Sequence, residues 1–269
     1  MEIKKLKEIA KELRRDIIVT IGKAGSGHTG GSLSAVELLV GLYFYKMKYD
    51  SKNPKWADRD RFIMSKGHAT PAMYSVLAKA GYFPKKELDS FRKFGSLLQG
   101  HVDIKVPGIE MSAGSLGMGL SFANGIEMAK RIDCKNYSVY VMLGDGEVQE
   151  GQIWESAMSA SFHRLNVTAI LDYNKVQQTG LVKDIMNIEP IAEKWKAFGW
   201  RVIEIDGHKI EEVVDALDKA AEIKDGPVII IANTIKGKGV SFMEYNNKFH
   251  GKALTEEEQK KAIEEIERG

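Results

Sequence analysis

The sequence predicts an α/β fold in which a parallel sheet is sandwiched between helices. Two patterns support this prediction: short apolar runs alternate along the chain with longer segments of helical periodicity, and several of these runs are apolar throughout. Strands of that kind are covered on both faces, as in parallel sheets with helical crossovers. A chain of 269 residues is also long enough to bury one sizeable core without disulfides.

The expected elements follow in alternating order. Ile3, Leu6, Ile9 and Leu13 recur at helical spacing with charges between them, so the N-terminus is expected to be an amphipathic helix rather than a signal peptide. Strands are expected at residues 61–64, 138–143, 167–172, 201–205 and 228–232. Further helices are expected at residues 33–45, 69–79, 116–131, 152–162, 191–198, 210–223 and 255–268, the last opening with a Thr-Glu-Glu-Glu capping pattern.

The composition narrows the classes of protein and partner. The 39 basic and 37 acidic side chains nearly balance, and no dense basic run indicates nucleic-acid binding. No stretch approaches about 18 apolar residues, so no membrane span is expected. The single Cys134 fits either a reducing compartment such as the cytoplasm or a protein indifferent to redox conditions. Because no repeat or Pro/Gly/Ser-rich linker interrupts the chain, residues 1–269 are expected to form a single domain.

Polar loops follow two of the expected strands. Asp145, between two glycines, comes after residues 138–143, and Asn174 comes after residues 167–172. Ligands in parallel α/β sheets bind outside the carboxyl ends of the strands, so both loops can face one crevice. Carboxylate and amide oxygens suit Mg²⁺, and glycines let a diphosphate approach the backbone. Alone, however, a Gly-Asp-Gly turn is more often structural.

Four of the six histidines stand beside glycine. Each one alone is more often a loop or core histidine satisfied by a backbone partner. Imidazoles exchange protons with hydroxyls near pH 7, so four in the same setting favour a carbohydrate site. The four are His28, His68, His101 and His250, whereas His163 and His208 lack that setting and are predicted to be structural.

Together these motifs resemble one enzyme family. The chain is similar to the N-terminal, diphosphate-binding part of transketolase, a thiamine diphosphate enzyme, and in particular to the small subunit of split, two-chain transketolases. The matching segments run in family order over nearly the whole chain: SGHTGGSL (26–33), DRDRF (58–62), SKGHA (65–69), GHVD (100–103), SAGSLG (112–117), GDGEVQEG (144–151), DYNK (172–175), KGKG (236–239) and HGK (250–252).

The resemblance implies a thiamine diphosphate-binding fold with a metal at the diphosphate. The side chains of Asp145 and Asn174 and the backbone carbonyl of Val176 would bind Mg²⁺, with Ca²⁺ or Mn²⁺ as alternatives. Gly146 would touch the diphosphate. The remaining cofactor contacts would come from the backbones of Gly114 and Leu116, at the aminopyrimidine, and from His68, Lys236 and His250, at the diphosphate and thiazolium.

The resemblance also implies a reaction. His28, His101 and His250 would face the sugar and manage its protons, and Glu150 and Glu155 resemble glutamates that link the two active sites at the subunit interface. The enzyme would move a two-carbon ketol unit from a ketose phosphate, such as xylulose 5-phosphate, to an aldose phosphate, such as ribose 5-phosphate, in the pentose phosphate pathway.

A second chain is implied as well. In transketolases a pyrimidine-binding domain supplies the activating glutamate, and neither this domain nor a C-terminal domain is expected here. The family's substrate-phosphate arginines also belong largely to this absent portion. The chain alone is therefore expected to be inactive, and to work as a dimer within a heterotetramer with a C-terminal transketolase subunit. Two alternatives stay open: a two-subunit enzyme for another sugar phosphate, and a non-catalytic subunit that binds Mg²⁺ and a diphosphate.

Overall fold

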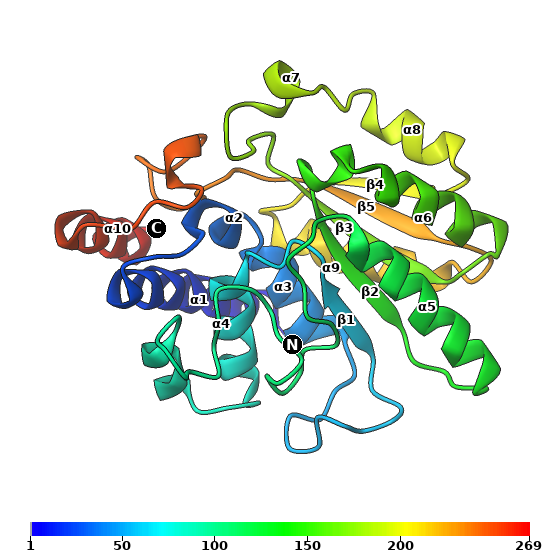
Figure 1. The fold of residues 1–269 in the computed structure, drawn as a ribbon, viewed down its shortest axis with the longest axis horizontal. Coiled ribbons are helices and arrows are strands. Elements are labelled where there is room, and N and C mark those ends of the chain that lie inside the picture. Colours follow the sequence, from blue (N-terminus) through cyan, green and yellow to red (C-terminus); the bar gives the residue numbers. More distant parts are fainter. Residues whose placement is uncertain (1) are drawn as a thin grey trace.

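A five-stranded sheet forms the centre of the computed structural model, which describes residues 2–269 (Figure 1). Every neighbouring strand pair is parallel, in the order β1-β2-β3-β5-β4. The predicted parallel α/β fold is therefore confirmed, and each strand lies within one residue of its expected bounds. The strands are β1 (Arg61–Met64), β2 (Val139–Gly144), β3 (Val167–Tyr173), β4 (Arg201–Asp206) and β5 (Val228–Asn233).

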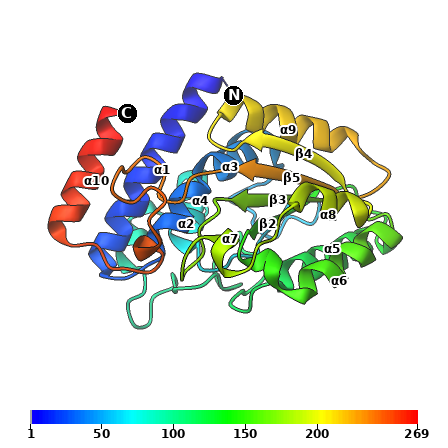
Figure 2. The same cartoon turned by 90° about the horizontal axis from the view of Figure 1, so that it is seen from above.

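Two layers of helices cover the sheet (Figure 2). The helices are α1 (Ile3–Ala24), α2 (Thr29–Ser34), α3 (Val36–Gly41), α4 (Thr70–Ala80), α5 (Met118–Ile132), α6 (Gly151–Phe162), α7 (Val182–Ile185), α8 (Ile191–Ala197), α9 (Ile210–Glu222) and α10 (Glu256–Arg268), with short turns η1 (Leu42–Lys46), η2 (Lys85–Ser90), η3 (Glu147–Gln149) and η4 (Asn247–Phe249). Buried side chains of α1, α3, α4 and α9 form one hydrophobic core, and those of α5, α6 and α8 form the other.

The central strand β3 shows why the strands are apolar throughout. Ile170 belongs to one core and Leu171 to the other, because successive side chains of a strand point to opposite faces. At one edge of the sheet this requirement is relaxed, and β4 is only partly buried, whereas the other edge strand, β1, is buried at three of its four residues. The continuous apolar runs therefore mark strands that are covered on both faces.

The two terminal helices lie side by side on one flank of the molecule (Figures 1 and 2). The predicted apolar face of α1 is buried, with Leu6 and Ile17 fully covered. Helix α10 begins with the expected capping box, in which the Thr255 side chain accepts from Glu258 N and the Glu258 side chain accepts from Thr255 N.

The predicted helix 33–45 is wrong in its bounds. The first helical turn begins earlier, at Thr29, and Ala35 separates α2 from α3. The chain then continues as a π-helical turn, η1. Because residues 29–43 are all buried, their apolar pattern has no wet face and gives no sign of where the helix breaks.

The start of α5 also differs from the prediction. The expected helix 116–131 begins only at Met118, because Gly117 adopts a left-handed backbone with φ of 86°. Glycine has no Cβ to oppose that conformation. Leu116 therefore stays outside the helix, where its backbone groups are available to a ligand.

The structure also addresses the expectations about membrane spans and the single cysteine. Among residues 2–269, no helix combines the length and the apolar character that crossing a membrane requires. Cys134 is exposed and unpaired, and its left-handed backbone ends the turn after α5. The cytoplasmic location inferred from the single cysteine stays a prediction.

Candidate active site

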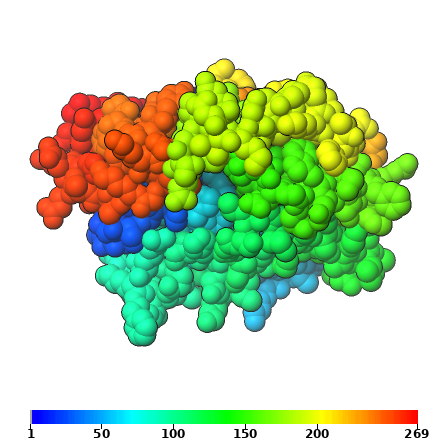
Figure 3. All heavy atoms as spheres, turned by 45° about the horizontal axis from the view of Figure 1, so that its top comes forward, coloured from blue at the N-terminus to red at the C-terminus, as the bar shows by residue number. Residues whose placement is uncertain are grey.

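A cavity of about 450 Å³ lies at the carboxyl edge of the sheet. Figure 3 shows a hollow near the middle of the visible face, bordered by the orange segment after β5, the yellow-green segment after β3 and the blue-green segment before α5. Because the ends of parallel strands share one edge, loops far apart in the chain meet here. The predicted site residues that line the cavity are His28, His68, His101, Gly114, Leu116, Asp145, Gly146, Glu150, Asn174, Val176, Lys236 and His250.

Only one predicted site residue lies outside this cavity. Glu155 is exposed on α6 and lines no wall of it, whereas the exposed Glu150, just before the same helix, stands at its edge. The two glutamates thus share the N-terminal end of α6 and the surface around it. Their role at a subunit interface stays a prediction.

The four glycine-flanked histidines form one cluster. The ring of His28 lies 5.0 Å from that of His68, 5.3 Å from that of His250 and 6.2 Å from that of His101, measured between centroids. His68 and His250 are 5.3 Å apart. These residues come from four separate loops, so the shared sequence setting does correspond to a shared place.

Burial keeps these imidazoles neutral. Burial and the charge of Arg92 lower the pKa of His28 to about 4, and burial and the charge of Lys66 lower the pKa of His68 to about 2. Burial and the charge of Lys236 lower the pKa of His250 to about 3, and the pKa of His101 is lowered mainly by burial. At pH 7 each ring therefore has one N–H donor and one acceptor nitrogen.

Lys236 fixes the tautomer of His250. Its buried Nζ lies 2.7 Å from the Val176 carbonyl oxygen and 2.8 Å from His250 Nδ1. Burial lowers the pKa of Lys236 to about 8, so near pH 7 it is mainly an ammonium, which only donates. His250 Nδ1 must then accept, and the Nε2–H of His250 remains available as a donor.

The Asp145 and Asn174 loops are tied together directly. Asp145 Oδ1 accepts from Gly146 N at 2.7 Å, its Oδ2 accepts from Lys175 N, and Asn174 Oδ1 accepts from Val176 N at 3.1 Å. Burial and the negative charge of Asp172 raise the pKa of Asp145 to about 6. A cation beside Asp145 would offset that cost of burial.

The donor set is that of a hard cation with few protein ligands. Within residues 2–269 no group of three or more His, Cys, Asp or Glu side chains could hold a metal. A metal here would depend on one carboxylate, one amide oxygen and one backbone carbonyl, completed by oxygens of a bound diphosphate and water. This is the pattern typical of Mg²⁺.

The walls of the cavity leave room for a ligand. A Cβ added to Gly114 would meet nothing within 4 Å, and one added to Gly31 would come no closer than 3.8 Å to another atom. Packing within the protein therefore does not require glycine at these two lining positions. His28 Nδ1 is buried in the same wall and has no hydrogen-bond partner among the described residues. Open space beside glycines and an unsatisfied imidazole nitrogen both fit a bound polar cofactor.

The prediction missed a buried ion pair in the wall of the cavity, where Lys66 is a lining residue. Lys66 Nζ contacts Asp172 Oδ2 and donates to the Gly31 carbonyl at 2.8 Å. Asp172 also accepts from Ser34 Oγ at 2.6 Å and from the Thr234 hydroxyl. The two charged residues stand inside the motifs SKGHA and DYNK, but nothing local in either motif pairs them.

A second missed residue is Glu147, which is buried in the cavity wall. Its carboxylate accepts from the Ser65 hydroxyl, from Gly117 N at 2.9 Å and from Gly144 N at 3.0 Å. One side chain therefore holds together the loops that follow β1 and β2 and the loop that precedes α5. The sequence did offer one sign that Glu147 lies at the site, namely its position two residues after Asp145.

The fold and this cavity define a parallel α/β domain with a ligand site at the carboxyl edge of its sheet. Residues 5–266 match the family model described as "Transketolase, thiamine diphosphate binding domain". The chain belongs to this family. Membership supports a transferase of the ketol type with thiamine diphosphate as its cofactor.

Curated relatives of similar length are named as subunits. The chain is 46% identical to the 6-deoxy-6-sulfo-D-fructose transketolase subunit SqwG of Clostridium sp. (strain MSTE9), over 98% of this chain and 96% of that one. It is 39% identical to an apulose-4-phosphate transketolase subunit of Phocaeicola vulgatus, over 99% and 95%. Human transketolase is also 39% identical, but the match spans 98% of this chain and only 42% of that protein.

Solved structures agree with this relationship. The crystal structure of transketolase from Campylobacter jejuni superposes with a TM-score of 0.93 at 35% identity, over 99% of this chain and 43% of that one. Transketolase from Leishmania mexicana gives 0.92 at 30% identity, over 97% and 41%. The chain thus corresponds to about two fifths of these longer enzymes.

Proposed function

We propose that the chain is the thiamine diphosphate-binding subunit of a two-chain transketolase. Two relatives that it spans over 96% and 95% of their length are named as transketolase subunits. The observation that carries the proposal is the meeting of four neutral imidazoles with the Asp145 and Asn174 loops in one cavity. Residues 1–269 would form a single diphosphate-binding domain, and the partner would carry the pyrimidine-binding and C-terminal domains.

The cavity residues would hold the cofactor in the manner their chemistry allows. Asp145, Asn174 and the Val176 carbonyl would bind Mg²⁺, with Ca²⁺ or Mn²⁺ as substitutes, and Gly146 would lie against the diphosphate. The remaining contacts would come from the Gly114 and Leu116 backbones and from His68, Lys236 and His250. When bound, thiamine diphosphate would supply the nucleophilic carbon and the electron sink for carbon–carbon bond cleavage.

The histidines would manage the protons of the sugar. His250 offers an Nε2–H donor, because Lys236 occupies its Nδ1. His28 and His101 are neutral and can each accept a hydroxyl proton through one nitrogen while donating through the other. Cleavage and formation of the carbon–carbon bond in ketol transfer require a sugar hydroxyl to lose and regain a proton. Neutral imidazoles suit this role.

An exposed apolar face beside the cavity favours a partner chain. Met118 and Phe122 on α5 and Met158 and Phe162 on α6 are exposed, and Glu150 precedes the first residue of α6 at the cavity edge. Exposed apolar patches of this kind are typical of protein interfaces. We expect this face to be covered in a heterotetramer of two copies of this chain and two partner chains in the cytoplasm.

The substrate is the point on which the relatives diverge. The names of two relatives specify a sulfonated fructose and apulose 4-phosphate. We expect transfer from xylulose 5-phosphate to ribose 5-phosphate, as in the pentose phosphate pathway. The test is to assay the chain together with its co-purified partner on this pair, with and without thiamine diphosphate and Mg²⁺. Failure to form sedoheptulose 7-phosphate, with activity on another ketose phosphate or sulfonate, would favour a different sugar specificity.

A non-catalytic role is the remaining alternative. A subunit that only bound a metal diphosphate would have no use for an imidazole facing the sugar. In the reconstituted complex, His101→Ala should therefore lower kcat while leaving the dissociation constant of thiamine diphosphate close to that of the wild type. Unchanged turnover in this variant would favour the binding-only interpretation.

A further inference from the structure

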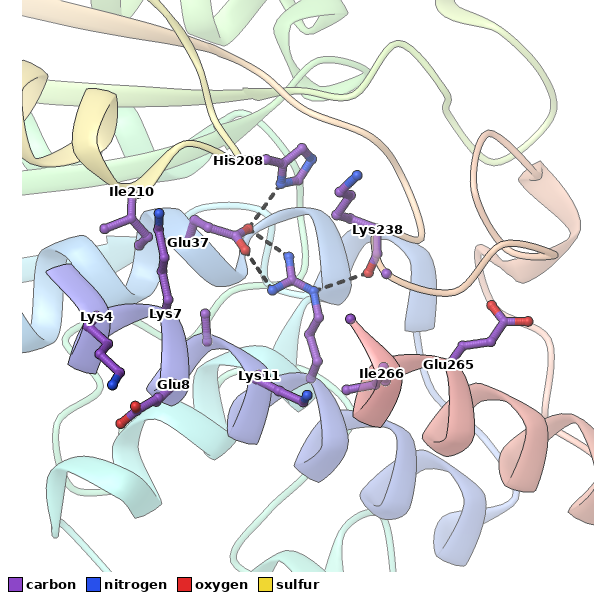
Figure 4. A pocket seen from close by; sticks show the side chains of 14 residues that line it. Lys4, Lys7, Glu8, Lys11, Glu37, His208, Ile210, Lys238, Glu265 and Ile266 are labelled. Atoms are coloured by element: carbon purple, nitrogen blue, oxygen red, sulfur yellow. Dashed lines mark hydrogen bonds and ion pairs between the residues drawn. The ribbon is translucent and has the colours of Figure 1, made fainter.

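A second cavity, of about 610 Å³, lies between α1, α10 and the segments that follow β4 and β5 (Figure 4). None of its lining residues belongs to the candidate active site. Three of them, Arg14, Glu37 and His208, form a buried ionic cluster contributed by α1, α3 and the turn after β4. The sequence left His208 without a function beyond structure.

Glu37 is in direct contact with both other members of the cluster. Arg14 pairs with Glu37 through two contacts of 2.6 and 2.7 Å, and His208 Nδ1 lies 3.0 Å from Glu37 Oε2. Burial opposes the charge of Glu37, yet Arg14 and His208 lower its pKa to about 2. Glu37 is therefore a carboxylate that orients the two side chains beside it.

Both partners of Glu37 reach the segment that follows β5. His208 Nε2 accepts from Ile235 N at 2.8 Å. Arg14 Nε donates to the Lys238 carbonyl at 3.2 Å, the contact drawn as a dashed line at Lys238 in Figure 4. Because Nε2 accepts, the proton of His208 lies on Nδ1 and is donated to Glu37. The cluster thus holds the backbone at the residue before Lys236 and at the second residue after it.

Lys236 extends from this held segment into the other cavity. Its side chain is 2% exposed, and its Nζ meets the Val176 carbonyl and His250 Nδ1. Because Lys236 is buried, its four side-chain bonds cannot rotate freely to compensate, so a rotation of its backbone displaces Nζ from both partners. The position of Lys236 Nζ therefore depends on how firmly residues 235 to 238 are held.

We propose that Arg14, Glu37 and His208 are positioning residues: by holding the backbone on either side of Lys236, they keep its Nζ in place in the active-site cavity. None of the three lines the active-site cavity, so they act only through the backbone of residues 235–238. The consequence for cofactor binding rests on the proposed function, in which Lys236 contacts the diphosphate side of thiamine diphosphate. The effect of the cluster on the backbone of residues 235–238 does not rest on the proposed function.

The test uses two substitutions that each keep one half of the His208 contacts. His208→Gln places an amide oxygen near the position of Nε2 and can still accept from Ile235 N. His208→Asn places its amide near the position of Nδ1 and can still donate to Glu37, but it cannot reach Ile235 N. Lys7→Gln is the control, because Lys7 lines the same cavity and pairs with the exposed Glu211.

Two measurements are made on each variant of the reconstituted complex. His208→Asn should raise amide hydrogen exchange in residues 234–238 and raise the dissociation constant of thiamine diphosphate with Mg²⁺ about 3- to 10-fold, the range of one hydrogen bond. His208→Gln and Lys7→Gln should stay within about twofold of the wild type.

The outcomes separate the two proposals. Unchanged exchange in His208→Asn, equal effects in the Asn and Gln variants, or raised exchange with unchanged cofactor binding would each overturn the positioning role. If the wild-type complex binds no thiamine diphosphate, the proposed function fails instead, and the exchange measurement still decides whether the cluster holds the segment.

Discussion

Two buried ionic clusters contact the segment that follows β5, and they differ in the exposed fraction of their side chains. Lys66 lines the active-site cavity and pairs with Asp172, with side chains 2% and 0% exposed, whereas Arg14 and Glu37 line the second cavity and are 10% and 8% exposed. Asp172 contacts the segment after β5 by accepting a hydrogen bond from the Thr234 hydroxyl. The second cluster contacts the same segment at two backbone groups, Ile235 N and the Lys238 carbonyl.

The difference in burial predicts different consequences when each cluster loses a partner. Asp172 is fully buried and lines neither cavity, so breaking its pair with Lys66 leaves a charge with almost no surface that water can reach, and this pair is expected to be essential for folding. Water in the second cavity can partly replace a lost partner there, so changes in that cluster are expected to alter the loop while the fold survives. Substitutions in the two clusters should therefore differ in their effect on the free energy of unfolding.

The largest effect is expected for Asp172→Asn. This change leaves the Lys66 ammonium buried without a counter-charge and should lower the free energy of unfolding by about 3–5 kcal/mol, measured by urea denaturation of the isolated chain. Asp215→Asn is the control, because Asp215 pairs with Lys219 on the surface and should contribute less than about 1 kcal/mol. Equal losses in the two variants would show that the Lys66–Asp172 pair is not essential.

Glu37→Gln should have an intermediate effect. The glutamine keeps the shape of Glu37 and can still accept hydrogen bonds, but it removes the charge that faces Arg14 and His208. We expect a loss of about 1–3 kcal/mol by the same denaturation measurement. A loss as large as that of Asp172→Asn would contradict the proposed role of water in the second cavity.

The pH dependence of Glu37→Gln sharpens this test. The pKa of Glu37 falls from 4.5 to about 2 on folding, because Arg14 and His208 outweigh burial. Its contribution is thus complete above about pH 4.5 and is lost as the pH falls toward 2, since the unfolded chain takes up the proton first. The difference in unfolding free energy between wild type and Glu37→Gln should shrink from about pH 6 to about pH 3; a constant difference would rule out this linkage.

The smallest effect on stability is expected in the cavity itself. Gly114→Ala adds a methyl group into open space, so the free energy of unfolding should change by less than about 1 kcal/mol. The dissociation constant of thiamine diphosphate in the reconstituted complex should nevertheless rise several-fold. Gly226→Ala, which also adds its Cβ into open space but lies outside the cavity, should leave that constant unchanged. Identical binding by both variants would remove Gly114 from the cofactor site.

The sequence allowed those parts of the site to be predicted that follow from strand order. Asp145 and Asn174 come directly after strands, and parallel strands end at one edge, so their meeting could be inferred from position alone. The four histidines share a glycine neighbour, which gave a local signal for a cluster that the fold then assembled.

The supporting residues could not be found in this way. Arg14, Glu37 and His208 come from three distant parts of the chain, and no local pattern links them. The break at Ala35 was hidden because that stretch is buried on every side. The late start of α5 depended on the φ of Gly117, which a periodic pattern does not report.

The central claim is that this chain provides the cofactor-binding half of a two-chain transketolase. The most direct measurement is the rate of ketol transfer at a fixed concentration of this chain as the co-purified partner is added, with thiamine diphosphate and Mg²⁺ present. We predict negligible turnover by either chain alone, a rise that saturates at one partner per chain, and loss of turnover without the cofactor. Full activity of the chain by itself, or none at any ratio, would contradict the claim.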